Sequence, residues 1–163
     1  MNRLLVLLDV NNLYYCISKK FDGARLDYSK LLEFISTKGS IIRTVAYGSS
    51  IGNQADRFLS ILHSLGIETR FKEPLVYQNA DGENRKADWD VGIAMDAARM
   101  LDTYDTLVLG SADGDMAELL KYIHERGRRS IVIGTRISRI TRDFAGEAIE
   151  IMPSLLERPA AVA

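Results

Sequence analysis

The sequence predicts an α/β protein of three layers, with helices on both faces of a mainly parallel sheet of five or six strands. Two observations lead to this fold class. Short, continuous apolar runs recur along the chain, as is typical of strands buried on both faces. Amphipathic patterns of helical length fill the intervals between them, and this alternation favours a doubly wound sheet. The 163 residues suffice for one such domain and are too few for two ordinary ones.

The expected strands are runs rich in Leu, Val and Ile. They lie at residues 3–9, 40–47, 67–71, 105–110 and 130–134, with a weaker one near 148–151. Between residues 76 and 86, the turn sequence Asn79-Ala80-Asp81-Gly82 predicts a hairpin close to the functional site.

The helices are expected from apolar positions at helical spacing and from residues that cap or stop them. They are predicted at residues 12–19, 28–37, 54–64, 90–101, 115–125 and 137–144. Asn11 or Asn12 is the expected cap of the first helix, and Asp27 that of the second. The pattern weakens after residue 152, so we expect one domain over residues 1–152 and a flexible tail over residues 153–163.

The composition is that of an ordinary globular protein, with 47% hydrophobic and 26% charged residues. The net charge of −1 means that a polyanion would be bound by local basic patches and not by the field of the whole molecule. Cys16 is the only cysteine, which excludes an internal disulfide. No apolar run approaches the roughly 20 residues of a membrane span, and no signal-like start is present. We therefore expect a cytoplasmic protein without membrane contact.

Acidic residues stand where the apolar strands should end. Asp9 closes the first strand, and Asp113 and Asp115 follow the strand at 105–110. In open α/β sheets, ligands bind in the crevice beyond the carboxyl ends of the strands. Carboxylates gathered there repel one another unless a proton or a cation intervenes, and Mg²⁺ is held by a few carboxylates together with phosphate and water. The sequence thus predicts a metal-dependent phosphodiester site.

A helical segment between these strands supplies further acids. Asp90 opens the helix at 90–101, Asp88 precedes it and Asp96 lies within it. Six residues separate Asp90 from Asp96, or about 9 Å along the axis and roughly 120° around it, so the two cannot share one ion. Asp90 is therefore the ligand candidate, whereas Asp96 is either a supporting residue or a buried carboxylate that pairs with Arg99. The expected catalytic and metal-binding residues are Asp9, Asp90, Asp113 and Asp115.

Each of these acids also has a plainer interpretation. Asp9 and Asp88 are residue types that cap helices, and Asp113 and Asp115 suit a turn followed by a helix N-terminus. Ser111 is placed to orient a carboxylate or to donate to a phosphate oxygen. Trp89 is a candidate for base stacking, although aromatic burial is the commoner role. Among the basic residues, Lys86 lies next to the acids, and Arg136, Arg139 and Arg142 are spaced as a helical stripe suited to a phosphate backbone, or simply to solvent.

Three motifs together resemble those of NYN domains in the PIN-like nuclease superfamily, specifically the bacterial LabA-like group. They are Leu8-Asp9-Val10-Asn11-Asn12-Leu13, Lys86-Ala87-Asp88-Trp89-Asp90-Val91-Gly92-Ile93 followed by Asp96, and Leu109-Gly110-Ser111-Ala112-Asp113-Gly114-Asp115. The resemblance implies a PIN-like fold, a pocket for Mg²⁺ or Mn²⁺ and single-stranded RNA as the substrate class. By position it implies an acidic centre of Asp9, Asp90, Asp113 and Asp115, supported by Asn12, Ser111 and Asp96. Asp88 is a further supporting candidate.

The chain departs from the family pattern at three places. Ala112 and Met116 replace the usual Gly and Phe of the last motif, and Gly146 follows Ala145 where relatives tend to place an Asp. Because members of the group are also linked to regulation, two functions remain open: a metal-dependent ribonuclease, or a non-catalytic RNA- or protein-binding module that retains the pocket. The sequence leaves the oligomeric state open, including a homo-oligomer.

Overall fold

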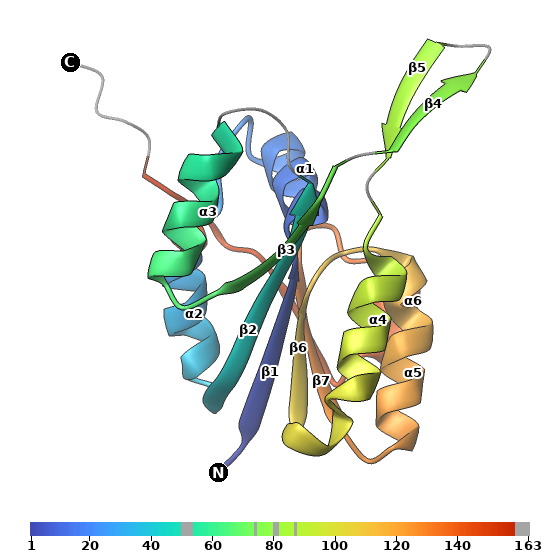
Figure 1. The fold of residues 1–163 in the computed structure, drawn as a ribbon. Coiled ribbons are helices and arrows are strands. Elements are labelled where there is room, and N and C mark those ends of the chain that lie inside the picture. Colours follow the sequence, from blue (N-terminus) through green and yellow to red (C-terminus); the bar gives the residue numbers. More distant parts are fainter. Residues whose placement is uncertain (50–53, 74, 80–81, 87, 159–163) are drawn as a thin grey trace.

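The central sheet has six strands, all parallel, in the order β3-β2-β1-β6-β7-β8. The computed structural model describes residues 1–49, 54–73, 75–79, 82–86 and 88–158. The strands are β1 (Arg3–Asp9), β2 (Ser40–Ser49), β3 (Glu68–Lys72), β6 (Thr106–Gly110), β7 (Arg129–Gly134) and β8 (Glu147–Glu150). The predicted α/β fold class is confirmed, and all six expected strands are present (Figure 1).

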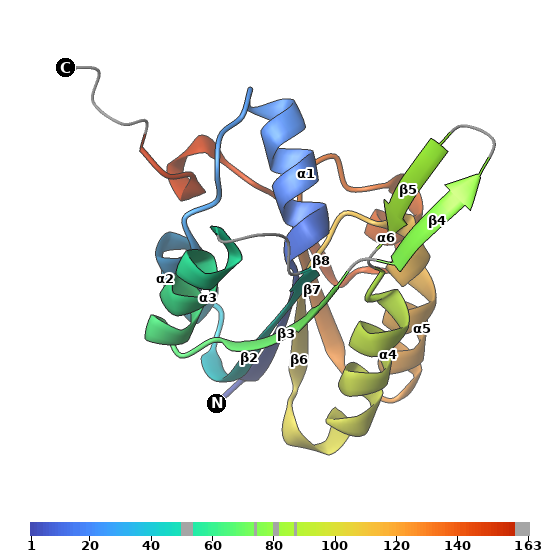
Figure 2. The same cartoon turned by 45° about the horizontal axis from the view of Figure 1, so that its top comes forward.

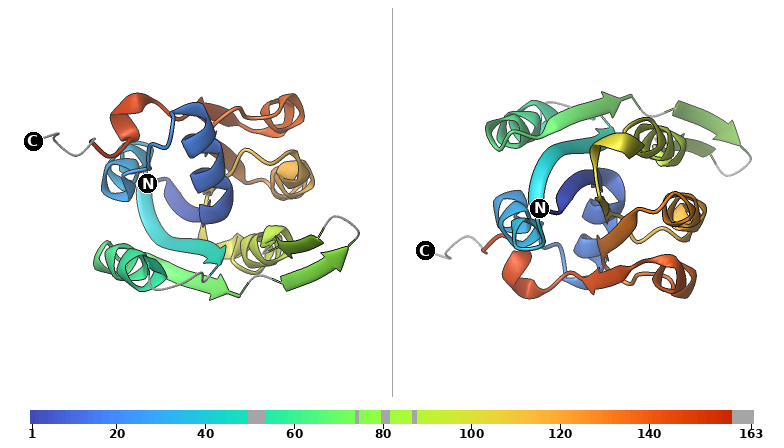
Figure 3. Two further views of the ribbon diagram at one scale, coloured as in Figure 1. Left: turned by 90° about the horizontal axis from the view of Figure 1, so that it is seen from above. Right: turned by 90° about the horizontal axis from the view of Figure 1, so that it is seen from below.

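Helices cover both faces of this sheet, which gives the three layers expected (Figure 3). They are α1 (Val10–Lys20), α2 (Tyr28–Ser36), α3 (Gln54–Ser64), α4 (Asp90–Arg99), α5 (Ala117–Glu125) and α6 (Arg139–Phe144), with 3₁₀ turns η1 (Leu101–Thr103), η2 (Gly114–Met116) and η3 (Pro153–Leu155). Asp27 caps α2 as predicted, by accepting a hydrogen bond from the Lys30 backbone amide. No helix in the described part of the chain is long and apolar enough to cross a membrane.

The alternation of side chains along β1 builds two separate cores. Leu4, Val6 and Leu8 pack with α1, α2 and α3 on one face. Leu5 and Leu7 pack with α4 and α5 on the other. Because successive strand residues point to opposite faces, Asp9 continues the series of Leu5 and Leu7 and is directed toward the α4 and α5 side.

The strand order creates a topological switch point between β1 and β6. From β1 the chain moves outward through β2 and β3, and it then returns to the other side of β1 with β6, β7 and β8. The ends of the two central strands are aligned, since Leu8 pairs with Gly110. Ligands of doubly wound sheets bind at such a switch point, so the segments that follow Leu8 and Gly110 define the crevice.

A two-stranded hairpin projects from the body at the same end of the molecule (Figures 1 and 2). It consists of β4 (Leu75–Asn79) and β5 (Gly82–Lys86), paired antiparallel with Asn79 opposite Gly82. The predicted hairpin is therefore present. Residues 80 and 81, in the middle of its turn sequence, lie outside the described residues.

The segment after residue 152 differs from the expectation of a flexible tail beginning at residue 153. Leu155 and Leu156 are buried in the core beneath α1 and α2. The Leu155 carbonyl accepts a hydrogen bond from the Asp27 amide, and the Glu157 amide donates to the Arg25 carbonyl. Residues 153–157 are thus part of the folded unit. The sequence pattern hid this because two apolar residues in a short 3₁₀ turn carry no periodic signal.

This packing predicts that Leu155→Ala lowers the free energy of unfolding by about 2–3 kcal/mol, through lost apolar burial and the cavity left behind. Ser154→Ala is the matched control, because Ser154 is exposed in the same turn. Urea denaturation compares the two variants. A midpoint for Leu155→Ala equal to that of the parent would show that this turn does not belong to the core.

Candidate metal centre

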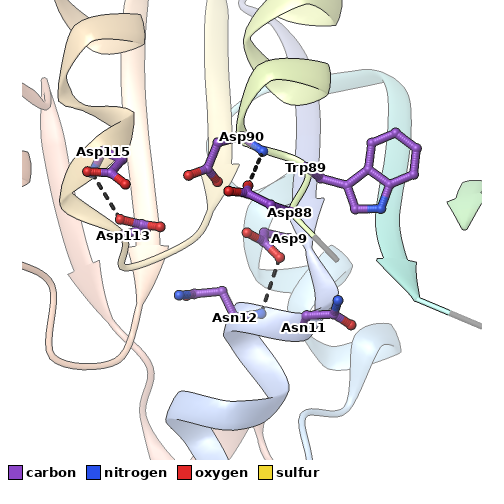
Figure 4. Close-up of a pocket in the computed structure, with 8 residues that line it drawn as sticks. All are labelled: Asp9, Asn11, Asn12, Asp88, Trp89, Asp90, Asp113 and Asp115. Atoms are coloured by element: carbon purple, nitrogen blue, oxygen red, sulfur yellow. Dashed lines mark hydrogen bonds between the residues drawn. The ribbon is translucent and has the colours of Figure 1, made fainter. Parts of the chain in front are cut away.

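A pocket of about 360 Å³ opens at the switch point of the sheet (Figure 4). The described residues that line it are Asp9, Asn11, Asn12, Asp88, Trp89, Asp90, Asp113 and Asp115. The four acids predicted as metal ligands therefore meet in one pocket, although they come from three separate stretches of the chain. Five carboxylates and no basic residue stand among these described lining residues.

Three of the carboxylates are spaced for a shared cation. One oxygen each from Asp90, Asp113 and Asp115 lies within 4.8 Å of the others. Opposite ligands of an octahedral Mg²⁺ are about 4.2 Å apart, twice the Mg–O distance of about 2.1 Å. Adjacent ligands are closer, at about 3.0 Å, so the three oxygens would need to draw together to share one ion. Hard oxygen donors at this spacing fit Mg²⁺ or Mn²⁺.

Asp9 closes the floor of the pocket and is nearly buried. It is also the residue that caps α1, because its Oδ1 accepts a hydrogen bond from the Asn12 backbone amide at 3.2 Å. Asn11 and Asn12, the caps expected from the sequence, lie within the first turn instead. Burial raises the pKa of Asp9 to about 6, with smaller contributions from the charges of Asp113 and Asp88, against the lowering effect of the Asn12 hydrogen bond.

Asp90 reaches the pocket from the first residue of α4. Burial raises its pKa to about 7, and the neighbouring carboxylates, with Asp113 the strongest, act in the same direction. The Asp88 carboxylate accepts a hydrogen bond from the Asp90 amide at 2.8 Å. Asp88 thus satisfies a free amide at the start of α4, although Trp89 is its N-cap residue, and it also lines the pocket; its role in a metal site stays a prediction.

The loop after β6 is ordered by hydrogen bonds to its own backbone. The Asp113 amide donates to Ser111 Oγ at 3.2 Å, and the Asp115 amide donates to Asp113 Oδ1 at 2.9 Å. From α1, Asn12 Oδ1 accepts a hydrogen bond from the Ala112 amide at 2.9 Å. Ser111 is completely buried. Its hydroxyl supports the backbone of the loop that carries Asp113, and the expected contact with a phosphate oxygen stays a prediction.

Asp96 lies outside the described lining of the pocket, so it contacts other partners. It is buried on the far side of Trp89, where its carboxylate accepts a hydrogen bond from the Tyr47 hydroxyl at 2.7 Å. Arg70 forms an ion pair with it at 2.9 Å, and the expected partner Arg99 lies at 3.7 Å. The separation by 120° around the helix explains this: Asp90 faces the crevice and Asp96 faces the sheet.

Trp89 connects the Asp96 network to the acidic pocket. Its ring packs on Tyr47 with centroids 5.5 Å apart, and its Nε1 donates to the Gly48 carbonyl at 2.8 Å. The Lys72 ammonium lies 4.3 Å from the ring centroid. A Cβ at Gly92 would come within 2.7 Å of the Trp89 ring, so only glycine leaves room for it. Trp89 therefore anchors the chain between Asp88 and Asp90 to β2.

Residues that sequence reasoning missed belong to this scaffold. Tyr47 and Lys72 come from β2 and β3, and no local motif joins them to Trp89. Asn11 was interpreted only as a helix cap, yet it lines the pocket and accepts a hydrogen bond from Ser49. Its position two residues after Asp9 was the one available signal.

The three arginines do not form the predicted helical stripe. Helix α6 begins only at Arg139, and Arg136 precedes it in a left-handed turn with φ of 57°. Arg142 is paired with Glu150. The spacing of three residues predicted that all three arginines lie on one helix face. The helix begins only after its cap at Ser138, so Arg136 is not part of it. Lys86 ends β5, and its side chain lies outside the described residues.

A doubly wound parallel sheet with carboxylates converging at its switch point defines a class of α/β proteins with an acidic pocket, and the architecture is consistent with a PIN-like fold. The NYN domain model matches residues 3–152, so the chain belongs to the NYN domain family. The resemblance inferred from the three motifs is thereby confirmed.

Two relatives extend over nearly the whole chain. The low amplitude and bright protein LabA of Synechococcus elongatus is 26% identical over 158 residues, which cover 92% of this chain and 84% of that protein. The crystal structure of a Vibrio parahaemolyticus protein of unknown function superposes with a TM-score of 0.85 and is 26% identical, with 96% of each chain covered.

The Asp96 network predicts a stability effect that differs between two substitutions. Asp96→Ala leaves the Tyr47 hydroxyl and the Arg70 guanidinium without their acceptor, so we expect the free energy of unfolding to fall by about 2–3 kcal/mol. Asp96→Asn keeps one acceptor oxygen and should lose less. Urea denaturation measures both, with Asp102→Asn, an exposed carboxylate, as the control. Equal midpoints for Asp96→Ala and the control would refute the network.

The raised pKa of Asp9 predicts how stability depends on pH without metal. Its pKa is near 3.8 in the unfolded chain and about 6 in the folded one. The folded state therefore binds more protons between pH 4 and 7, and stability falls as pH rises through that window. We expect Asp9→Asn, which can still cap α1, to gain roughly 1–3 kcal/mol over the parent at pH 8 in chelator and little at pH 4. Melting curves at both pH values test this; a gain independent of pH would contradict it.

Proposed function

We propose that this protein is a metal-dependent ribonuclease that hydrolyses phosphodiester bonds of single-stranded RNA. The observation that carries the proposal is the convergence of Asp90, Asp113 and Asp115 within 4.8 Å at the switch point of an NYN domain. These carboxylates repel one another, which destabilises the folded state without metal. A bound divalent cation removes this repulsion.

The side chains of the pocket have distinct tasks in this proposal. Asp90, Asp113 and Asp115 would hold Mg²⁺ or Mn²⁺, which supplies charge stabilisation at the phosphate and lowers the pKa of bound water. Asp9 lies behind them with a pKa of about 6, so near neutral pH it is able to accept a proton from an attacking water. Asn12 and Ser111 hold the loop that carries Asp113 in place.

A hydrolytic mechanism agrees with the composition of the described lining. It contains no Ser-His or Cys-His pair that could form a covalent intermediate, so a water nucleophile is the remaining route. A phosphohydrolase of haloacid-dehalogenase type would instead need an aspartyl nucleophile with a second acid two residues on, and Asn11 stands at that position after Asp9. The second candidate function, a non-catalytic RNA- or protein-binding module, shares the pocket but would not turn over.

Cleavage of a single-stranded RNA oligonucleotide tests the proposal. We expect cleavage with Mn²⁺ or Mg²⁺, none in chelator, and a loss of roughly two orders of magnitude or more in Asp113→Asn, since a ligand of the charge-stabilising cation is removed. Asp56→Asn, an exposed carboxylate on α3, is the matched control.

Metal binding by calorimetry completes the test. A parent protein that binds Mn²⁺ and RNA without cleaving the RNA would establish the non-catalytic module instead. A cleavage rate in Asp113→Asn equal to that of the parent would exclude the acidic centre as the active site.

A further inference from the structure

Helix α1 carries a row of side chains that leads away from the acidic pocket. Asn11, Tyr15 and Lys19 are spaced by four residues, and such residues lie above one another on one helix face. Asn11 lines the pocket. Each step of four residues advances about 6 Å along the axis, so Tyr15 and Lys19 stand about 6 and 12 Å beyond Asn11. The opposite face, with Val10, Leu13 and Ile17, is buried.

Tyr15 presents its ring to solvent on this row. Its exposed fraction is 64%, and the Lys19 ammonium lies 5.8 Å from the ring centroid. The ring is not needed for core packing, because aliphatic residues already fill the core side of α1. An exposed aromatic ring with a cation beside it is the combination that binds single-stranded nucleic acid: every base has a face that can stack, and each phosphate requires a positive charge.

Arg136 adds a second cation next to the same stretch of α1. Its backbone amide donates to Glu150, and Glu150 in turn pairs with Lys20 in the last turn of α1, so Arg136 lies close to the end of this helix. Arg136 adopts a left-handed backbone with φ of 57°, which costs about 1–2 kcal/mol for a residue with a Cβ. The Glu150 carboxylate stabilises the turn by accepting hydrogen bonds from the amides of Arg136 and Ile137.

The ion pairs of this region leave two of its cations available. Glu150 pairs with Lys20 and Arg142. Within the described part of the chain, the ammonium of Lys19 and the guanidinium of Arg136 have no acidic partner. An acidic pocket repels a polyanion, so a phosphodiester substrate must be held by positive charge at the rim. Lys19 and Arg136 supply that charge beside α1.

We propose that Tyr15, Lys19 and Arg136 form a binding strip for single-stranded RNA, in which a base stacks on Tyr15 and the flanking phosphates bind Lys19 and Arg136. The strip directs a strand along α1 from the pocket. It rests on the proposed function for the choice of RNA as the occupant. The strip therefore assigns substrate binding to α1 and Arg136, and not to Arg139 and Arg142 of α6.

Binding of a labelled single-stranded RNA of ten nucleotides tests the strip, by fluorescence anisotropy on the full chain in chelator so that cleavage does not interfere. Tyr15→Ala should lower the affinity about 5- to 100-fold, the range for losing one stacked base. Tyr15→Phe should keep the parent affinity. Tyr14→Ala is the matched control, because Tyr14 is equally exposed, at 61%, but points about 100° away around the helix.

The salt dependence separates the cations from the ring. Lys19→Gln and Arg136→Gln should each reduce the slope of log affinity against log salt by about 0.7, whereas Tyr15→Ala should leave it unchanged. Arg126→Gln, an exposed arginine at the end of α5, is the control and should not alter the slope. An affinity of Tyr15→Ala equal to that of the parent, or a parent that binds no single-stranded RNA, overturns the proposal.

Cleavage by the same variants with metal distinguishes this proposal from the proposed function. If the strip holds substrate, Tyr15→Ala raises KM and leaves kcat near that of the parent. A parent that cleaves RNA, together with strip variants of unchanged KM, would reject the strip and keep the ribonuclease. A parent that binds RNA through the strip without cleaving it would keep the strip and reject the ribonuclease.

Discussion

Repulsion among carboxylates at the switch point is the constraint on which the rest of this structure depends. Asp9, Asp88, Asp90, Asp113 and Asp115 line one pocket, and the pKa values of Asp9 and Asp90 are raised to about 6 and about 7. The surrounding structure holds together groups that would separate if they were free to do so. Such an arrangement favours any cation or proton that enters, which is the property expected of a metal site.

Hydrogen bonds from backbone amides and the packing of the Trp89 side chain hold these carboxylates in place against their repulsion. Amides at three chain segments donate to Asp9, Asp88 and Asp113. Trp89 fixes the segment between Asp88 and Asp90 by its hydrogen bond to the Gly48 carbonyl and by its contact with Tyr47. Asp96 holds Tyr47 in turn. Among the described residues, these bonds leave the side-chain oxygens of Asp90 and Asp115 without a hydrogen-bond donor.

Positive charge is distributed around the pocket and not within its described lining. Lys72 lies against Trp89, Lys19 is on α1, and Arg136 is joined through Glu150 to Lys20 at the end of α1. Glu150 neutralises Lys20 and Arg142 and shapes the turn that presents Arg136. A net charge of −1 therefore averages over a local separation of charge between the acidic pocket and the basic residues around it.

The sequence by itself determined the fold class, the approximate position of each strand and helix, and the membership of Asp9, Asp90, Asp113 and Asp115 in one site. These features are local: apolar periodicity sets the elements, and parallel strands bring their carboxyl ends to one edge. The tertiary structure alone decided the role of Asp96, because its partners Tyr47 and Arg70 come from distant strands. It also decided that residues 153–157 are packed, that Arg136 stands apart from α6, and that the α1 row of Tyr15 and Lys19 begins at Asn11 in the pocket. Contacts between segments far apart in the chain carry no periodic signal, so no single stretch of sequence could reveal them.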